Sequence, residues 1–219
     1  MRKLVAAGLM LLGACTAAAA QDTARIEQAY ARRLAAQQQA DVQQRIAARQ
    51  MALENAPSSP ALGNPGGDVV IVEFFDYNCP YCKAVEPRLE ALLKSDRKVK
   101  LVLKEFPILT PASMTGTRAA LASVRQGKYR QFHNAMMNFR GQLMDADVFD
   151  MAKASGLDVA RLRKDMTAPE ISDEIIANFN LARGIRVFQT PAFIVGGRLM
   201  DSESANINFP RAVAAARGK

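Results

Sequence analysis

Two apolar runs predict neighbouring β-strands near the middle of the chain. The run VVIVEFF at 69–75 is β-branched and aromatic without polar alternation, which is typical of a strand buried on both faces. The run KVKLVLKEF at 98–106 alternates between polar and apolar positions and predicts a second strand. A leucine-rich segment between these runs predicts a helix over about 80–94.

The chain from Thr110 to Gly184 contains no strand candidate, and its pattern predicts helices punctuated by glycine or proline. These helices are expected at 112–125, 128–138, 146–154, 159–166 and 171–183. After them, TPAFIVGGRLM predicts two strands joined by a Gly196–Gly197 hairpin turn, and a short helix at 209–217 closes the chain. The element order is β-α-β, a long helical insertion, and β-β-α, which indicates an α/β fold.

The segment 22–55 lacks Gly and Pro and is rich in Ala, Gln and Arg, which are good helix formers. Its larger apolar side chains lie near one helical face, at Ile26, Tyr30, Leu34, Val42, Ile46 and Leu53. This stripe is thin and follows no strict heptad, so the segment is expected to be a solvated stalk or an oligomerisation helix. The segment 56–68 is rich in Pro, Gly and Ser and predicts an irregular linker.

The N-terminus has the order of a secretory signal, because Arg2 and Lys3 precede the apolar run LVAAGLMLLGA and then the small residues of CTAAAAQ. That run is shorter than the about 20 residues that span a bilayer. Residues 1–20 are therefore expected to form a signal peptide. Alternatively, LGAC resembles a lipoprotein box that would leave Cys15 as a lipidated first residue. Either form predicts export to an oxidising compartment, where disulfides persist.

Composition sets limits on the function. The 219 residues are 49% hydrophobic and 23% charged, which is an ordinary balance for a globular chain. The net charge of +8 is spread along the sequence, without an arginine-rich arm or basic–aromatic interleaving. Nucleic-acid binding is therefore not expected.

The folded region contains one cysteine pair, Cys79 and Cys82, separated by Pro80 and Tyr81. The preceding strand and the helix that starts near Pro80 place Cys79 at a helix N-terminus. Unpaired backbone N–H groups and the helix dipole stabilise a thiolate there, which lowers the pKa of Cys79 below about 8.5. Cys82 lies one turn further on the same side, close enough to close a disulfide.

Other uses of the cysteine pair are less well supported. A structural zinc site needs four ligands, and the folded region offers two cysteines and one histidine, His133, which is expected to be a packed or surface residue. A purely structural disulfide over so short a loop restrains little chain entropy. A Cu(I) site on two thiolates is the more reasonable metal alternative. Redox chemistry is the favoured use.

Glu73 interrupts the apolar run at 69–75. Its carboxylate lies either at an exposed strand edge or beneath the cysteine pair, where burial would raise its pKa and let it carry the proton of Cys82. Lys104, on the second predicted strand, is expected to face either this carboxylate or solvent.

The motif EFFDYNCPYCK, followed later by QTPAFIVGG, resembles the DsbA-like branch of the thioredoxin superfamily, which includes ScsC-like proteins. These are periplasmic thiol–disulfide oxidoreductases. The resemblance implies a thioredoxin fold with a helical insertion domain and an N-terminal helical extension. The implied ranges are a helical extension at 21–56, a thioredoxin-like domain at 57–109 and 185–219, and an inserted helical domain at 110–184.

The resemblance also implies roles for the candidate catalytic residues. Cys79 matches the exposed nucleophile of the family, and Cys82 matches the cysteine that resolves the mixed disulfide. Glu73 matches a position that is acidic in the family. The two cysteines would form the redox-active disulfide, without a metal or an organic cofactor.

Substrate binding is expected to involve Pro80 and Tyr81 between the cysteines, together with Thr190 and Pro191. The last two match the cis-proline loop that lies beside the disulfide and pairs with the substrate backbone. The implied partners are unfolded or misoxidised exported proteins and a membrane redox partner of the DsbB or DsbD type.

The chain departs from the best-known family member, which has a histidine where this chain has Tyr81. Tyr81 and Thr190 make the chain more similar to the isomerase-like and ScsC-like relatives, whose N-terminal extension can form oligomers. The sequence leaves open whether the protein oxidises, isomerises or reduces disulfides. An alternative function is Cu(I) binding, or copper tolerance, in the cell envelope through the same thiol pair.

Overall fold

The computed structural model describes the backbone of residues 2–200 and 206–218, and the side chains of 21–200 and 206–218. The chain divides into two compact units, residues 1–42 and residues 43–219. The expected signal peptide and the lipid anchor at Cys15 involve side chains outside the described part, so both stay predictions.

Residues 1–42 contribute most of helix α1, which spans Arg2–Ala47. The side chains of residues 21–40 are exposed, including the apolar Ile26, Tyr30 and Leu34. Among the residues with described side chains, no helix combines the length and apolar character that a membrane span requires.

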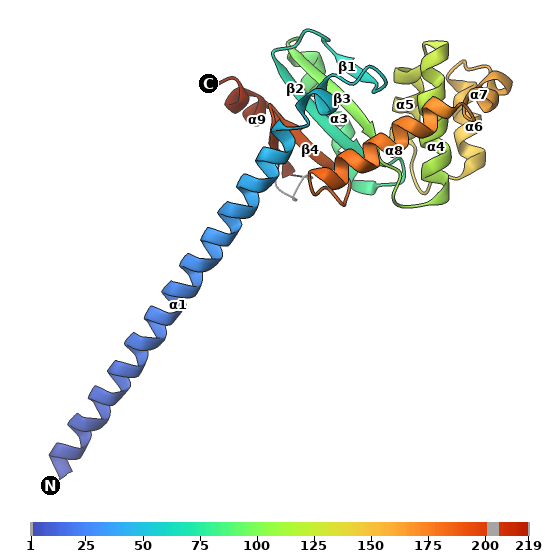
Figure 1. The fold of residues 1–219 in the computed structure, drawn as a ribbon. Coiled ribbons are helices and arrows are strands. Elements are labelled where there is room, and N and C mark those ends of the chain that lie inside the picture. Colours follow the sequence, from blue (N-terminus) through green and yellow to red (C-terminus); the bar gives the residue numbers. More distant parts are fainter. Residues whose placement is uncertain (1, 201–205, 219) are drawn as a thin grey trace. The chain divides into compact units, whose positions relative to one another are not determined.

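A mixed sheet of five strands forms the centre of residues 43–219 (Figure 1). The strands are β1 (Ala61–Gly63), β2 (Val69–Phe75), β3 (Val99–Glu105), β4 (Ala192–Val195) and β5 (Arg198–Leu199), in the order β1-β3-β2-β4-β5. The central β2 pairs in parallel with β3 and antiparallel with β4. The sequence prediction of four of these strands is confirmed, and the burial of β2 follows from its uninterrupted apolar character.

One expectation for the region before β2 was wrong: the expected irregular linker contains β1, which pairs antiparallel with β3. The segment 22–55 is helical, as expected, but in two pieces: α1 ends at Ala47, and a short helix α2 (Gln50–Glu54) follows. Ile46 and Leu53 are buried, because these last apolar positions of the stripe belong to the packed body.

Helices cover both faces of the sheet. The face that carries Glu73 packs against α3 (Pro80–Ser95) and α9 (Phe209–Ala216), as the edge-to-face contact of Phe193 with Phe209 shows. The opposite face packs against α2 and α8 (Pro169–Gly184). The cysteines lie at the start of α3, on the Glu73 face.

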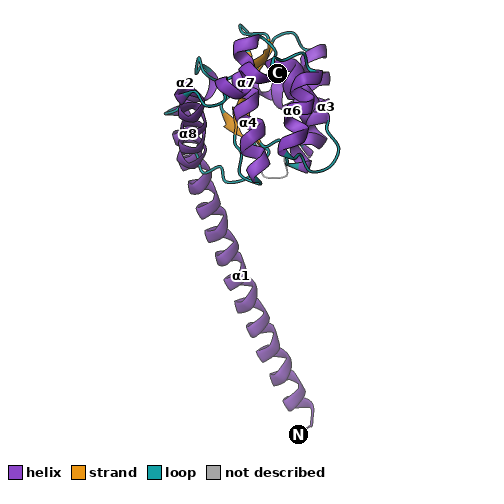
Figure 2. Ribbon diagram, turned by 90° about the vertical axis from the view of Figure 1, so that its right-hand side faces the viewer, coloured by secondary structure: helices purple, strands orange, loops and turns teal. Residues whose placement is uncertain are grey.

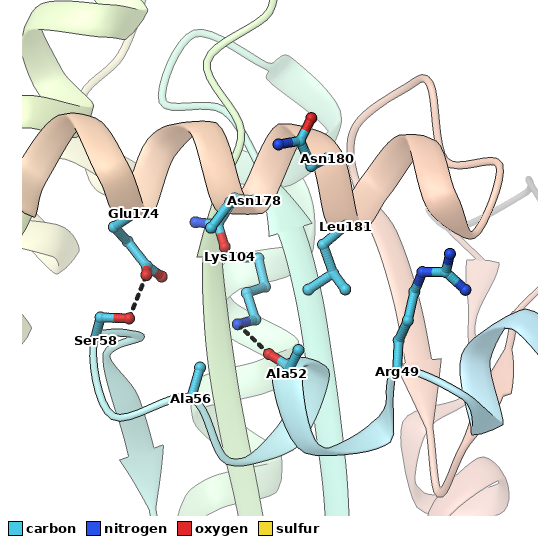
Figure 3. A pocket seen from close by; sticks show the side chains of 10 residues that line it. Arg49, Ala52, Ala56, Ser58, Lys104, Glu174, Asn178, Asn180 and Leu181 are labelled. Atoms are coloured by element: carbon cyan, nitrogen blue, oxygen red, sulfur yellow. Dashed lines mark hydrogen bonds between the residues drawn. The ribbon is translucent and has the colours of Figure 1, made fainter.

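Both alternatives for Lys104 were wrong. Lys104 pairs in register with Phe74, the neighbour of Glu73, and successive strand residues point to opposite faces. Its buried ammonium donates to the carbonyl of Ala52 at 2.8 Å and to the hydroxyl of Ser59 at 2.6 Å. Figure 3 shows Lys104 in a pocket that is lined by residues of α2 and α8, on the face of the sheet opposite to Glu73.

The insertion between β3 and β4 is helical, as predicted, and packs around α4 (Figure 2). Its helices are α4 (Pro111–Ser123), α5 (Tyr129–Asn138), α6 (Asp145–Ala154) and α7 (Val159–Asp165), followed by α8; a 3-10 turn, η1 (Val124–Gln126), follows α4. Thr110 caps α4 with a reciprocal pair of hydrogen bonds to Ser113. The division of the chain into a thioredoxin-like and a helical domain remains a prediction.

Candidate active site

Cys79 is the N-cap of α3, and Pro80 occupies the first helical position, where a missing N–H costs nothing. The turn that brings the chain from β2 to this cap is fixed by Asp76. The carboxylate of Asp76 accepts hydrogen bonds from the N–H of Asn78 at 2.7 Å and from the hydroxyl of Ser113 at 2.7 Å. The sequence therefore builds a rigid turn that delivers one sulfur to a helix N-terminus.

The sulfur of Cys79 lies between α3 and the segment before β4. The N–H of Cys82 donates to this sulfur at 3.4 Å, and the Cys79 thiol donates to the carbonyl of Thr190 at 3.3 Å. The peptide bond between Thr190 and Pro191 is cis, as expected from the sequence. The hydroxyl of Thr190 is buried and has no hydrogen-bond partner among the described residues.

The pKa of Cys79 is lowered to about 6. The largest cause is the hydrogen bond from the Cys82 thiol; Thr190 and the backbone N–H groups of Cys82 and Tyr81 add to it, while burial opposes them. The helix N-terminus thus contributes as predicted, but the partner cysteine contributes more. Cys79 is a thiolate at neutral pH.

The pKa of Cys82 changes in the opposite direction. Burial is the main cause that raises it well above its ordinary value, and the hydrogen bond to Cys79 and the charge of Glu73 add to the effect. Cys82 therefore stays protonated while Cys79 is ionised. This difference gives the two sulfurs separate tasks.

Glu73 is fully buried beneath the cysteine pair, which resolves the alternative left by the sequence. Burial raises its pKa well above the ordinary value, and the charges of Glu86, Cys79 and Glu105 raise it further. Neither carboxylate oxygen has a hydrogen-bond partner among the described residues. Burial therefore favours the protonated form of Glu73, and its unpartnered oxygens leave the carboxyl group free to exchange a proton.

The expectation of an exposed nucleophile was wrong, because Cys79 is only 3% exposed. The contact with Thr190 covers its sulfur. Pro80 and Tyr81 are exposed at the rim, with Tyr81 at 63%.

Sequence reasoning missed a buried polar network behind the cysteines. The carboxylate of Glu105 accepts hydrogen bonds from the hydroxyls of Tyr77 and Tyr129, both at 2.9 Å. The Tyr77 hydroxyl also contacts His133 Nδ1 at 3.0 Å, and His133 Nε2 lies 3.7 Å from Glu86. His133 is packed, as expected, and the position of Glu86 one turn after Cys82 was the one available signal for the network.

Comparisons with known proteins agree with this fold. The family model described as Thioredoxin matches residues 54–214. The thiol:disulfide interchange protein DsbA of Bordetella parapertussis is 28% identical over 148 residues, which cover 65% of this chain and 70% of that protein. The crystal structure of a thioredoxin-like oxidoreductase from Silicibacter pomeroyi is 40% identical, with a TM-score of 0.72, and the match covers 78% of this chain and 98% of that chain.

A further relative is the Na(+)/H(+) antiporter NhaA 3 of Salinispora tropica, which is 30% identical over 132 residues. The match covers 59% of this chain but only 20% of the antiporter, so the chain spans about a fifth of that relative. The match to the family model includes both cysteines and the cis-proline segment. The chain therefore belongs to the thioredoxin superfamily and, within it, to the DsbA-like branch.

Proposed function

We propose that the protein is a periplasmic thiol–disulfide oxidoreductase that exchanges disulfides with exported polypeptides through Cys79 and Cys82. The observation that carries this proposal is the opposite shift of the two thiol pKa values, downward for Cys79 and upward for Cys82. Such a pair supplies a nucleophile and a reserve thiol at the same pH.

Both cysteines are reduced in the structure, which is the form that attacks a substrate disulfide. The Cys79 thiolate bonds to one substrate sulfur, the substrate S–S bond breaks, and the departing sulfur takes up a proton. Cys82 then loses its proton, attacks the Cys79 sulfur and releases the second substrate thiol. Two electrons pass to the substrate, and the protein keeps the Cys79–Cys82 disulfide; the reverse sequence oxidises a substrate dithiol.

In its ionised form, Glu73 is proposed to accept the Cys82 proton in the resolving step, because its buried oxygens have no other partner among the described residues. Thr190 and Pro191 precede the first paired residue of β4, Ala192, and are proposed to bind the substrate backbone as an added strand. The exposed Tyr81 supplies apolar contact area at the rim.

The direction of exchange is proposed to be isomerisation or reduction. Stabilising the thiolate makes a pair more oxidising: thioredoxin combines a pKa near about 7 with about −270 mV, and DsbA combines about 3.5 with about −120 mV. With the pKa of Cys79 at about 6, the expected potential lies nearer to that of thioredoxin, at about −200 to −250 mV. A membrane partner of the DsbD type would then keep the pair reduced.

Cu(I) binding is less well supported as a function of this thiol pair. A metal ligand must be deprotonated, and the raised pKa of Cys82 opposes deprotonation of the second sulfur. The asymmetry of the pair favours disulfide exchange instead.

The test measures how fast the protein isomerises a substrate protein with scrambled disulfides. The readout is the return of the native activity of that substrate protein. Cys79→Ser is expected to abolish the reaction, and Cys82→Ser is expected to accumulate a mixed disulfide visible on a non-reducing gel. Unchanged turnover by Cys79→Ser, or no mixed disulfide with Cys82→Ser, would contradict the proposal.

A further inference from the structure

A pocket of about 540 Å³ adjoins the first turn of α3 and is not used by the proposed exchange reaction. Its walls include Pro80 and Lys83 from α3, together with Phe139, Arg140 and Gly141 from the loop after α5. Pro80 directly follows Cys79 in the chain. Anything bound in this pocket therefore contacts residues on both sides of the reactive cysteine in the chain, Asn78 and Pro80.

The walls of the pocket are tied together by hydrogen bonds. The side-chain amide of Asn78 donates to Thr110 Oγ1 at 2.8 Å and to the Leu143 carbonyl at 3.1 Å, and its oxygen accepts from the Leu143 N–H at 2.6 Å. The ammonium of Lys83 donates to the carbonyl of Gly141 at 3.1 Å. The pocket is therefore preformed, which lowers the entropic cost of filling it.

The two ionisable side chains that line the pocket, Lys83 and Arg140, are both cationic. They lie close enough for the Arg140 charge to help lower the pKa of Lys83, after burial, which is the main cause. Two nearby cations repel each other, so an anion between them is stabilised.

No carboxylate of the described chain provides that anion in the pocket. Arg140 has no ion pair among the described residues. The charges of Asp76 and, to a smaller extent, Cys79 oppose the lowering of the Lys83 pKa, but neither residue lines the pocket. The carboxylate of Asp76 is buried and also accepts hydrogen bonds from the N–H groups of Ile108 at 2.8 Å and Leu109 at 3.0 Å, besides its bonds to Asn78 and Ser113. Its hydrogen-bonding capacity is used by the protein itself.

We propose that this pocket receives an aspartate or glutamate side chain of the polypeptide whose cysteine reacts with Cys79. The acidic group would lie between Lys83 and Arg140, and its methylene stem would contact Phe139 and Pro80. This inference rests on the proposed function and adds a substrate class to it: polypeptides with an acidic residue near the reacting cysteine.

The experiment measures the second-order rate at which the reduced protein cleaves peptide disulfides. The peptides are acetylated and amidated, so terminal charges are absent, and they differ only in carrying Glu, Gln or Lys at one of the three positions on either side of the cysteine. Exposed ion pairs contribute little individually, so at the best position we expect Glu to react about three- to tenfold faster than Gln, with Lys slowest. The preference should shrink in high salt.

The variants separate this pocket from a general effect of the protein's net positive charge. Arg140→Gln and the double variant with Lys83→Gln are expected to reduce the preference to less than about twofold. Arg130→Gln, which removes an exposed cation of α5 that does not line the pocket, should retain the preference. The rate with neutral iodoacetamide checks that Arg140→Gln leaves the Cys79 thiolate unchanged.

Equal rates for the Glu, Gln and Lys peptides at every position would overturn the pocket proposal while leaving disulfide exchange intact. The same conclusion follows if Arg130→Gln reduces the preference as much as Arg140→Gln does. Failure to cleave any peptide disulfide would overturn the proposed function together with the inference.

Discussion

At the scale of single residues, the chemistry depends on what surrounds two sulfur atoms. The Cys79 sulfur receives hydrogen bonds from Cys82 and from the start of a helix, whereas the Cys82 sulfur is buried near Glu73. A sequence shows that the two cysteines are one turn apart, but it does not show these donors. The pKa values of the two cysteines therefore depend on a few atoms that come from separate segments of the chain.

Thr190 provides one test of this control. Its side chain contributes to lowering the pKa of Cys79, and its buried hydroxyl has no hydrogen-bond partner among the described residues. Thr190→Val removes this donor and is expected to raise the pKa of Cys79, whereas Thr190→Ser keeps the hydroxyl and should leave it nearly unchanged. The measurement is thiolate absorbance at 240 nm as a function of pH. Equal titration midpoints for the two variants would show that the hydroxyl has no role.

Glu73 gives a prediction for stability against pH. Its folded pKa is raised, so the folded protein keeps a proton that the unfolded chain releases above about pH 4.3, and stability falls as pH rises from there. Glu73→Gln removes this loss. The reduced variant is expected to be more stable than wild type at pH 8 and equally stable near pH 4, measured by urea unfolding.

The same variant has a kinetic consequence that a purely structural role would not produce. Because glutamine cannot accept the Cys82 proton, resolution of the mixed disulfide should slow while attack by Cys79 keeps its rate. An unchanged resolution rate in Glu73→Gln would remove Glu73 from the proton transfer.

At the scale of elements, the loop before β2 packs closely on the start of β3. A Cβ at Gly67 would approach the Lys98 carbonyl oxygen to 2.6 Å and the Lys100 nitrogen to 2.8 Å, both backbone atoms. Gly66→Ala is a matched control, because a Cβ there would meet only the side chain of Asn64 at 3.7 Å.

Gly67→Ala is expected to destabilise the protein by about 1–3 kcal/mol, since the backbone of β3 must move to accommodate the methyl group. Gly66→Ala should change stability far less. Denaturant unfolding of the two variants measures the difference, and equal midpoints would show that the loop can relax without cost.

The elements also show how far the sequence predicts this fold. The long apolar strands and the glycine-punctuated helices were predictable, because hydrophobic periodicity carries them. The strand β1 was not, since three residues in a Pro- and Gly-rich segment become a strand only by pairing with β3. Likewise, the side of the sheet that Lys104 faces depends on register with β2, which a single sequence does not reveal.

At the scale of the whole molecule, the compact unit 43–219 contains the cysteine pair, and residues 21–40 expose an apolar stripe at Ile26, Tyr30 and Leu34. Residues four apart lie on one face of a helix, so this stripe is suited to association with copies of itself. If copies associate through this stripe, the variant with glutamine at all three positions is expected to be a monomer where the wild-type protein is an oligomer. Analytical ultracentrifugation of the two proteins measures the difference. An identical sedimentation coefficient for both proteins would rule out this stripe as the oligomer interface.

The central claim is that Cys79 is a thiolate at neutral pH. Its most direct test is the rate of Cys79 alkylation by iodoacetamide between pH 4 and pH 10, with the modified cysteine identified by mass spectrometry. The predicted midpoint is about 6. A midpoint of about 8.5, the pKa of an ordinary cysteine, would contradict the account.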